Sequence, residues 1–133
     1  MINKSTAEIK IPKAYIVILN QLYEVEKKIS DIDDCQKVFR NIERMKDALR
    51  ENINTTYSGG VSAGLVYEDP MGEPFDDTRS DLDAHIAGEG TSNLVVIDVI
   101  KPIIRFVNPD MGISQVVQRG IVTVEELKNK EEN

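Results

Sequence analysis

The chain has 133 residues, a net charge of −7 and 41% hydrophobic residues. This acidity argues against a nucleic-acid-binding surface, which needs concentrated positive charge. The hydrophobic fraction is typical of a folded protein, and the longest apolar run, Leu94 to Ile100, is too short to span a bilayer. The N-terminal residues lack the basic and apolar regions of a signal peptide, so we expect a soluble, cytoplasmic protein.

A heptad pattern of apolar residues occupies the N-terminal part of the chain. Spacings of four and three alternate along Ile11, Tyr15, Ile18, Leu22, Val25, Ile29 and Ile32. This pattern predicts a helix that buries one narrow stripe against a partner helix. No Pro or Gly, the strongest helix breakers, occurs from Lys13 to Asn54. We therefore expect residues 1–56 to form a dimerisation stalk, whose interface residues are Ile18, Leu22, Val25, Ile29 and Ile32.

The segment Ser30-Asp31-Ile32-Asp33-Asp34 leaves two helical arrangements open. One continuous helix of about 40 residues is the favoured interpretation, because helix breakers are absent. However, Ser30 can cap a new helix, and the three carboxylates would suit the positive end of its dipole. The heptad also drifts after Ile32, where Gln36 occupies the next apolar position. A helical hairpin is therefore the alternative.

Short apolar runs separated by Gly, Pro and Asp follow the helical part. Gly59-Gly60 is the expected domain boundary, within a linker from Thr55 to Ala63. The runs predict strands of a small, mainly antiparallel β domain over residues 57–126, and residues 127–133 form a charged tail. The expected fold class is thus α+β. The five expected strands cover residues 61–67, 82–86, 94–100, 103–107 and 116–124.

The segment from Asp69 to Asp83 is the densest polar part of the chain, with six carboxylates in fifteen residues. Their spacing does not fit a calcium-binding loop of the EF-hand type, so an exposed acidic turn is expected rather than a metal site. His85 is the only histidine, and no nucleophile arrangement can be argued around it. We expect no catalytic activity and no cofactor.

Two stretches of the β domain resemble GrpE, the nucleotide exchange factor of seventy-kilodalton heat-shock chaperones. Gly72-Glu73-Pro74-Phe75-Asp76 resembles the Gly-x-x-Phe-Asp-Pro segment of that family, and 116–124 (VVQRGIVTV) resembles its closing strand. The order of a long helix, a linker and a β domain is also similar. The chain departs from the family at Asp77, which replaces a Pro, and at Gly120, which stands where a Pro follows the Arg.

The resemblance implies a non-catalytic, dimeric co-chaperone of the stress response, whose β domain opens the nucleotide lobe of the chaperone and releases ADP. The residues that it singles out for partner binding are Glu73, Phe75, Asp76 and Arg119. The alternative is an oligomeric adaptor, or a subunit of a larger assembly, that is unrelated to chaperones. An adaptor depends only on the heptad stripe, whereas the exchange factor depends on the β-domain motifs.

Overall fold

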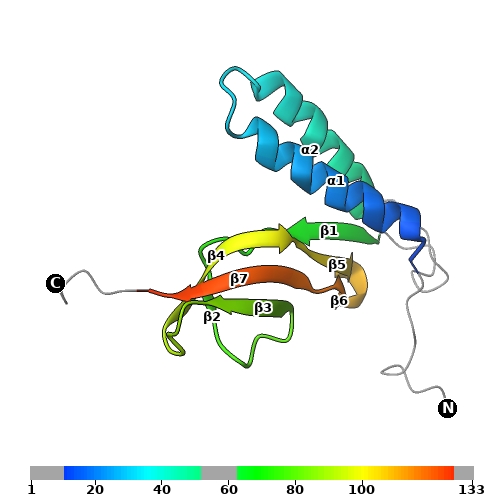
Figure 1. Cartoon of the computed structure of the whole chain (residues 1–133). Helices are drawn as coiled ribbons and strands as arrows, with labels where there is room; N and C mark the ends of the chain where they lie inside the picture. Colours follow the sequence, from blue (N-terminus) through cyan, green and yellow to red (C-terminus); the bar gives the residue numbers. More distant parts are fainter. Residues whose placement is uncertain (1–10, 52–62, 128–133) are drawn as a thin grey trace, which may run out of the picture. The chain divides into compact units, whose positions relative to one another are not determined.

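The computed structural model describes residues 11–51 and 63–127, and within these ranges the chain has an α+β fold (Figure 1). Two helices come first and two mainly antiparallel sheets follow. The α+β class expected from the sequence is therefore confirmed. The expected boundary at Gly59-Gly60 and the tail after Leu127 lie outside the described residues.

The helical part is a hairpin of α1 (Lys13–Ile29) and α2 (Gln36–Glu51), which run in opposite directions in Figure 1. The expected continuous helix is wrong, and the alternative hairpin is what forms. Ser30 is the C-terminal cap of α1, where its hydroxyl donates to the carbonyl oxygen of Lys27 at 2.7 Å and its N–H to that of Glu26. It does not cap the second helix, as the hairpin alternative had expected, because α2 begins only at Gln36. Asp34 then takes a left-handed backbone, with φ of 67°, a conformation that no helix accommodates.

Packing between the two helices uses only part of the apolar face of α1. Leu19, Leu22 and Tyr23 of α1 and Ile42 of α2 are buried. An ion pair between Glu26 and Lys46, at 3.6 Å, joins the two helices. The buried residues stabilise the hairpin by removing apolar surface from water.

Two sheets make up the β part. The three-stranded sheet has the order β1-β5-β6 and contains β1 (Gly64–Glu68), β5 (Ile103–Asn108) and β6 (Ile113–Gln118). The four-stranded sheet has the order β2-β4-β7-β3 and contains β2 (Pro74–Phe75), β4 (Leu94–Lys101), β7 (Gly120–Glu126) and β3 (Leu82–Ala87). Only β3 and β7 run parallel within this second sheet; β4 is antiparallel to both of its neighbours.

Most of the expected strands are present, but the last one is divided. The expected strand 116–124 ends at Gln118, and a new strand begins at Gly120 in the other sheet. Arg119 is thus the residue at which the chain changes sheets. Before β6, the turn from Asn108 to Gly112 contains a short 3-10 helix (η2, Pro109–Met111), which is capped by the Asn108 side chain and ended by Gly112 with φ of 66°.

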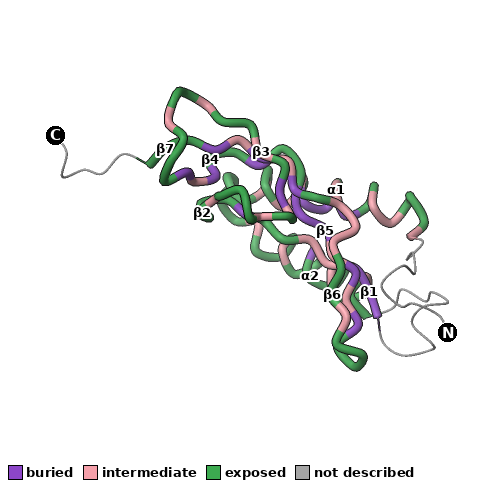
Figure 2. The backbone as a smooth tube through the Cα atoms, turned by 90° about the horizontal axis from the view of Figure 1, so that it is seen from below, coloured by how far each residue is buried: buried purple, intermediate pink, exposed green. Residues whose placement is uncertain are grey.

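Strand β4 departs from simple alternation at two β-bulges. Its register with β7 shifts between Val96 and Asp98, and again between Val99 and Lys101. Val96 and Val99 consequently both face the core, although they are three residues apart. Val95, Ile97 and Val99, which a regular alternation of side chains predicts on one face, therefore do not share a face, since bulges insert a residue that the partner strand does not match. Figure 2 shows the resulting burial along the backbone.

The chain divides into two compact units, Met1–Val66 with Phe106–Ser114, and Tyr67–Arg105 with Gln115–Asn133. The first unit contains the helical hairpin. There the backbone at Gly64 lies so close to the carbonyl groups of Leu49 and Arg50 that a Cβ atom has no room. The second unit contains the four-stranded sheet, whose buried side chains include Leu82, Val96, Val99, Val122 and Val124.

Candidate functional site

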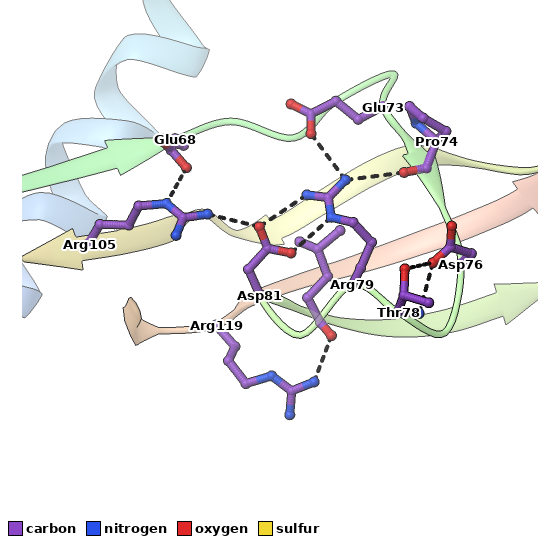
Figure 3. Close-up of polar contacts among 10 residues, drawn as sticks. Glu68, Glu73, Pro74, Asp76, Thr78, Arg79, Asp81, Arg105 and Arg119 are labelled. Carbon is purple, nitrogen blue, oxygen red and sulfur yellow. Dashed lines mark hydrogen bonds and ion pairs between the residues drawn. The ribbon is translucent and has the colours of Figure 1, made fainter. Parts of the chain in front are cut away.

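The acidic segment is organised by arginine side chains rather than left as a free turn. Asp81 lies at its centre and is only 16% exposed. Its Oδ1 accepts a hydrogen bond from Nε of Arg79 at 2.9 Å, and its Oδ2 accepts one from Nη2 of Arg105 at 2.9 Å (Figure 3). Nη2 of Arg79 also donates to Oδ2 at 3.3 Å. One carboxylate therefore holds two guanidinium groups.

The two arginines extend the network to neighbouring segments. Nη1 of Arg79 donates to Oε1 of Glu73 at 3.3 Å and to the carbonyl oxygen of Pro74 at 3.1 Å. Nε of Arg105, on β5, donates to Oε1 of Glu68, on β1, at 2.7 Å. The network thus ties the connection between β1 and β3 to strand β5.

Electrostatics at the centre of the network follow from these contacts. The hydrogen bond from Arg79 holds the pKa of Asp81 below its ordinary value, against the opposing effect of partial burial, and the charges of Arg79 and Arg105 add to the lowering. The same contact with Asp81 raises the pKa of Arg79. Asp81 and Arg79 therefore both stay charged at neutral pH.

The four residues that the sequence singles out for partner binding lie in the second unit, but in different settings. Glu73 is exposed and bonded to Arg79, while Phe75 is half-buried on β2 opposite Leu94. Asp76 is exposed, and its Oδ1 accepts bonds from the hydroxyl and the N–H of Thr78, which lower its pKa.

Arg119 contacts the two residues that follow Asp81, which are the first two residues of β3. Its Nη2 donates to the carbonyl oxygen of Leu82 at 2.7 Å, and its Nη1 lies 3.1 Å from Oδ1 of Asp83. Figure 3 shows Arg119 and the Arg79 cluster on either side of the start of β3. The structure therefore brings Glu73 and Arg119, 46 positions apart in sequence, to one part of the molecule through Asp81 and its neighbours.

The two segments of the family resemblance are also joined by strand β4. On one side, the N–H of Gly72 donates to the carbonyl oxygen of Val96 at 3.0 Å, and the N–H of Val96 donates to that of Glu73 at 2.9 Å. On the other side, β4 pairs with β7, the strand that follows Arg119. The first segment and the part of the second that begins at Gly120 are thus neighbours of the same strand, whereas 116–118 belongs to β6 in the other sheet.

One face of the four-stranded sheet is polar and accessible. The register aligns Asp98, Thr123 and His85 across β4, β7 and β3, and it aligns Lys101, Ile121 and Asp83 in the next row. His85 and Asp98 are exposed. In the described part of the chain, no three His, Cys, Asp or Glu side chains are arranged to hold a metal ion.

Sequence reasoning missed the arginines of the network. Arg79 and Arg105 belong to no motif, and Arg105 is separated from Glu68 by 37 positions. The only sequence signal is the surplus of carboxylates between Asp69 and Asp83, which requires cations nearby once part of it is buried.

No protein-family model, no curated protein and no solved structure matches this chain. Among the residues that the structure describes, no helix is long and apolar enough to cross a lipid bilayer.

Proposed function

We propose that this protein is a non-catalytic nucleotide exchange factor for a seventy-kilodalton heat-shock chaperone, similar to GrpE, and that it acts through its β part. The observation that carries the proposal is the position of the two resembling segments. They are about 40 residues apart in sequence, yet Gly72–Phe75 and the 120–124 part of the second segment lie on either side of β4. Two segments that form one functional surface must lie close together in the structure, whereas two segments that resemble a family by chance need not be neighbours.

Charge and order around the segments support a protein-binding role. Glu73 and Arg119 are exposed enough to reach a partner, and their side chains are held in place by ion pairs with Arg79 and Asp83. Side chains that are ordered before binding lose less conformational entropy when a partner docks. An exchange factor needs such an ordered surface, because it must favour one conformation of its partner without reacting with the nucleotide.

The helical hairpin supports a further part of the proposal, the homodimer. Ile18, Val25 and Ile32 follow one another at spacings of seven, and each is more than two-fifths exposed in the single chain. Leu22, by contrast, is buried and Ile29 is half-buried. The expected stripe thus has one part that is used within the chain and another part that is accessible to a second copy.

Helix α2 carries a matching exposed stripe. Two exposed apolar residues on each helix directly precede a residue on the side of the hairpin seam, which places them about 100° away from it in the same rotational sense. Because the helices run in opposite directions, the same rotation places both stripes on one side of the hairpin. We propose that two hairpins pair through this side into a four-helix bundle. The pairs of exposed and seam residues are Ile18 and Leu19, Val25 and Glu26, Val38 and Phe39, and Met45 and Lys46.

Release of fluorescent ADP from a heat-shock chaperone tests the proposed activity directly. Wild-type protein should accelerate release, and Arg119→Ala should reduce that acceleration at least several-fold. Arg44→Ala, which removes an exposed arginine from α2, is the matched control and should behave as wild type. Circular dichroism checks that each variant is folded.

The outcome also separates the two candidate functions. If the wild type neither accelerates ADP release nor forms a complex with the chaperone in size exclusion, the exchange-factor proposal is refuted. The oligomeric adaptor would then remain, because the exposed helical stripe that favours it is independent of the chaperone.

A further inference from the structure

Strand β3 has a free edge with an unusual sequence. It is the last strand in the order β2-β4-β7-β3, and within the described residues no other strand pairs with its outer side. Its six residues pair with β7 without a bulge and include no Pro and no Lys. Proteins normally protect an exposed edge strand with a bulge, a Pro or a Lys, because its unpaired N–H and C=O groups otherwise recruit further strands. At the other end of the sheet, β2 is protected by its length of two residues and by Pro74.

The register shows which backbone groups point outward. The N–H of Gly120 donates to the carbonyl oxygen of Asp81 at 2.9 Å, so the polar groups of Asp81 point toward β7. Backbone direction alternates along a strand, and those of Asp83 and His85 therefore also point toward β7. The groups of Leu82, Ala84 and Ile86 point to the free edge. One of them, the carbonyl of Leu82, already accepts a hydrogen bond from Arg119.

The sequence of this edge is complementary to itself. Residues 82–86 read Leu-Asp-Ala-His-Ile. In an antiparallel pair centred on Ala84, Asp83 lies opposite His85 of the second copy, and Leu82 lies opposite its Ile86. A carboxylate therefore meets an imidazole, which is an arrangement that stabilises a strand pair, while Ile86 lies beside the backbone of Leu82, whose side chain is buried in the single chain.

We propose that the free edge of β3 binds the same edge of a second copy of this chain, forming a continuous sheet across the two copies. Ala84 exchanges two backbone hydrogen bonds with its equivalent. The N–H of Leu82 donates to the carbonyl of the partner's Ile86, and the symmetric bond forms as well. None of these four bonds uses the carbonyl oxygen of Leu82, which keeps its hydrogen bond from Arg119. Since the edge is self-complementary through Asp83 and His85, a second copy fits it better than an unrelated peptide does.

Cross-linking at the symmetry axis tests the pairing in the full-length chain. In a Cys35→Ser background, Ala84→Cys places two thiols on directly opposed residues, whose Cα atoms are about 5.5 Å apart in a hydrogen-bonded antiparallel pair. Ile86→Cys is the control, because two copies of residue 86 are separated by four residues along the strands, about 13 Å. Residue 86 is also the more exposed of the two positions. With a bismaleimide of shorter reach than this separation, Ala84→Cys should give covalent dimers and Ile86→Cys should give several-fold fewer.

A change of charge at the edge provides the second measurement. His85→Asp places a second carboxylate opposite Asp83 of the other copy, and it should reduce cross-linking of the Ala84→Cys protein several-fold. Mixing this protein with an Ala84→Cys protein that carries Asp83→Lys should restore covalent dimers, because the new ammonium group then meets the new carboxylate across the pair.

Two outcomes would contradict the pairing of β3 edges. Equal cross-linking at positions 84 and 86 would show that the thiols react through random encounters between molecules, and it would overturn the proposal. Absence of cross-linking in a folded Ala84→Cys protein would also overturn the proposal. The edge of β3 would then be accessible to an extended segment other than the β3 strand of a second copy. Neither readout depends on the helical dimer or on ADP release.

Discussion

Arg105 on β5 donates a hydrogen bond from Nη2 to Oδ2 of Asp81 at 2.9 Å, across 24 positions of sequence. Asp81 also receives Arg79, so it is the carboxylate that joins both arginines. Replacing it with Asn should lower the free energy of unfolding by about 1.5–3 kcal/mol, since hydrogen bonds to charged groups contribute about this much and each guanidinium group loses one of its two carboxylate partners. Urea denaturation measures the loss.

Asp77→Asn is the matched control for this substitution. Asp77 is an exposed carboxylate of the same connection, and its replacement should change the stability by less than about 0.5 kcal/mol. Equal effects of the two substitutions would show that the network contributes nothing beyond general charge.

The stability of the protein should fall in acid because of Asp81. Its pKa is below the ordinary 3.8 in the folded state, chiefly through the Arg79 hydrogen bond. The unfolded chain therefore takes up a proton at a higher pH than the folded chain does. The stabilising contribution is present above about pH 4 and is lost as the pH falls through the lower folded pKa. Thermal unfolding followed from neutral pH into acid should show a steeper decline for wild type than for Asp81→Asn. Parallel curves would contradict this prediction.

The sequence predicts elements better than it predicts their interruptions. Alternation and turn residues locate β3 and β5 within a residue or two, because burial on one face of a strand imposes a period of two. The favoured interpretation, one continuous helix, misses the break between α1 and α2. This break depends on local hydrogen bonds of Ser30 and on the backbone conformation of Asp34 rather than on Pro or Gly. The change of sheet at Arg119 is also missed, because both flanking segments have the pattern of strands.

The candidate site is less predictable from the sequence than the fold. Glu73 and Arg119 are identified from a resemblance, whereas Asp81, which links their surroundings, is only one of six carboxylates in its segment. Which carboxylate becomes buried depends on the position of Arg105 in space. Contacts of this kind have no period or spacing that a single sequence can reveal.

Gly64→Ala should destabilise the first unit strongly. A Cβ atom there would collide with the backbone carbonyl groups of Leu49 and Arg50, which cannot move aside as a side chain end can. We expect a loss of about 2–3 kcal/mol, the upper range for overpacking. Gly88→Ala is the comparison: it has open space and only a positive φ of 80°, so it should cost about 1 kcal/mol. Urea denaturation should rank the two variants in this order.

Val25→Asp should weaken self-association through the helices. Val25 is 43% exposed, so its replacement places a charge in the proposed dimer contact while leaving the hairpin core in place. Sedimentation equilibrium should show a lower average mass at the same concentration, with unchanged helix content. Lys13→Asp alters an exposed residue on a different side of α1 and should leave the mass unchanged. A wild-type protein that sediments as a monomer would refute the helical dimer.

Asp34→Gly should stabilise the hairpin turn. Asp34 has a φ of 67°, a left-handed conformation that costs non-glycine residues about 1–2 kcal/mol. Glycine removes that strain but loses more entropy on folding, so a net gain of about 0.5–1 kcal/mol is expected. Thermal unfolding measures the gain, and a decrease in the melting temperature would show that the Asp34 side chain stabilises the turn in some other way.

The two bulges of β4 have a geometric consequence for the whole four-stranded sheet. The eight residues of β4 from Leu94 to Lys101 pair with only six residues of β7, from Ile121 to Glu126. A longer strand beside a shorter one forces the sheet to curl, as a strip with one stretched edge does. Shortening β4 by removing both extra residues would flatten this curl. The spacing between Val96 and Val99 would then return to two residues, and the same strand connectivity would enclose a core of different shape.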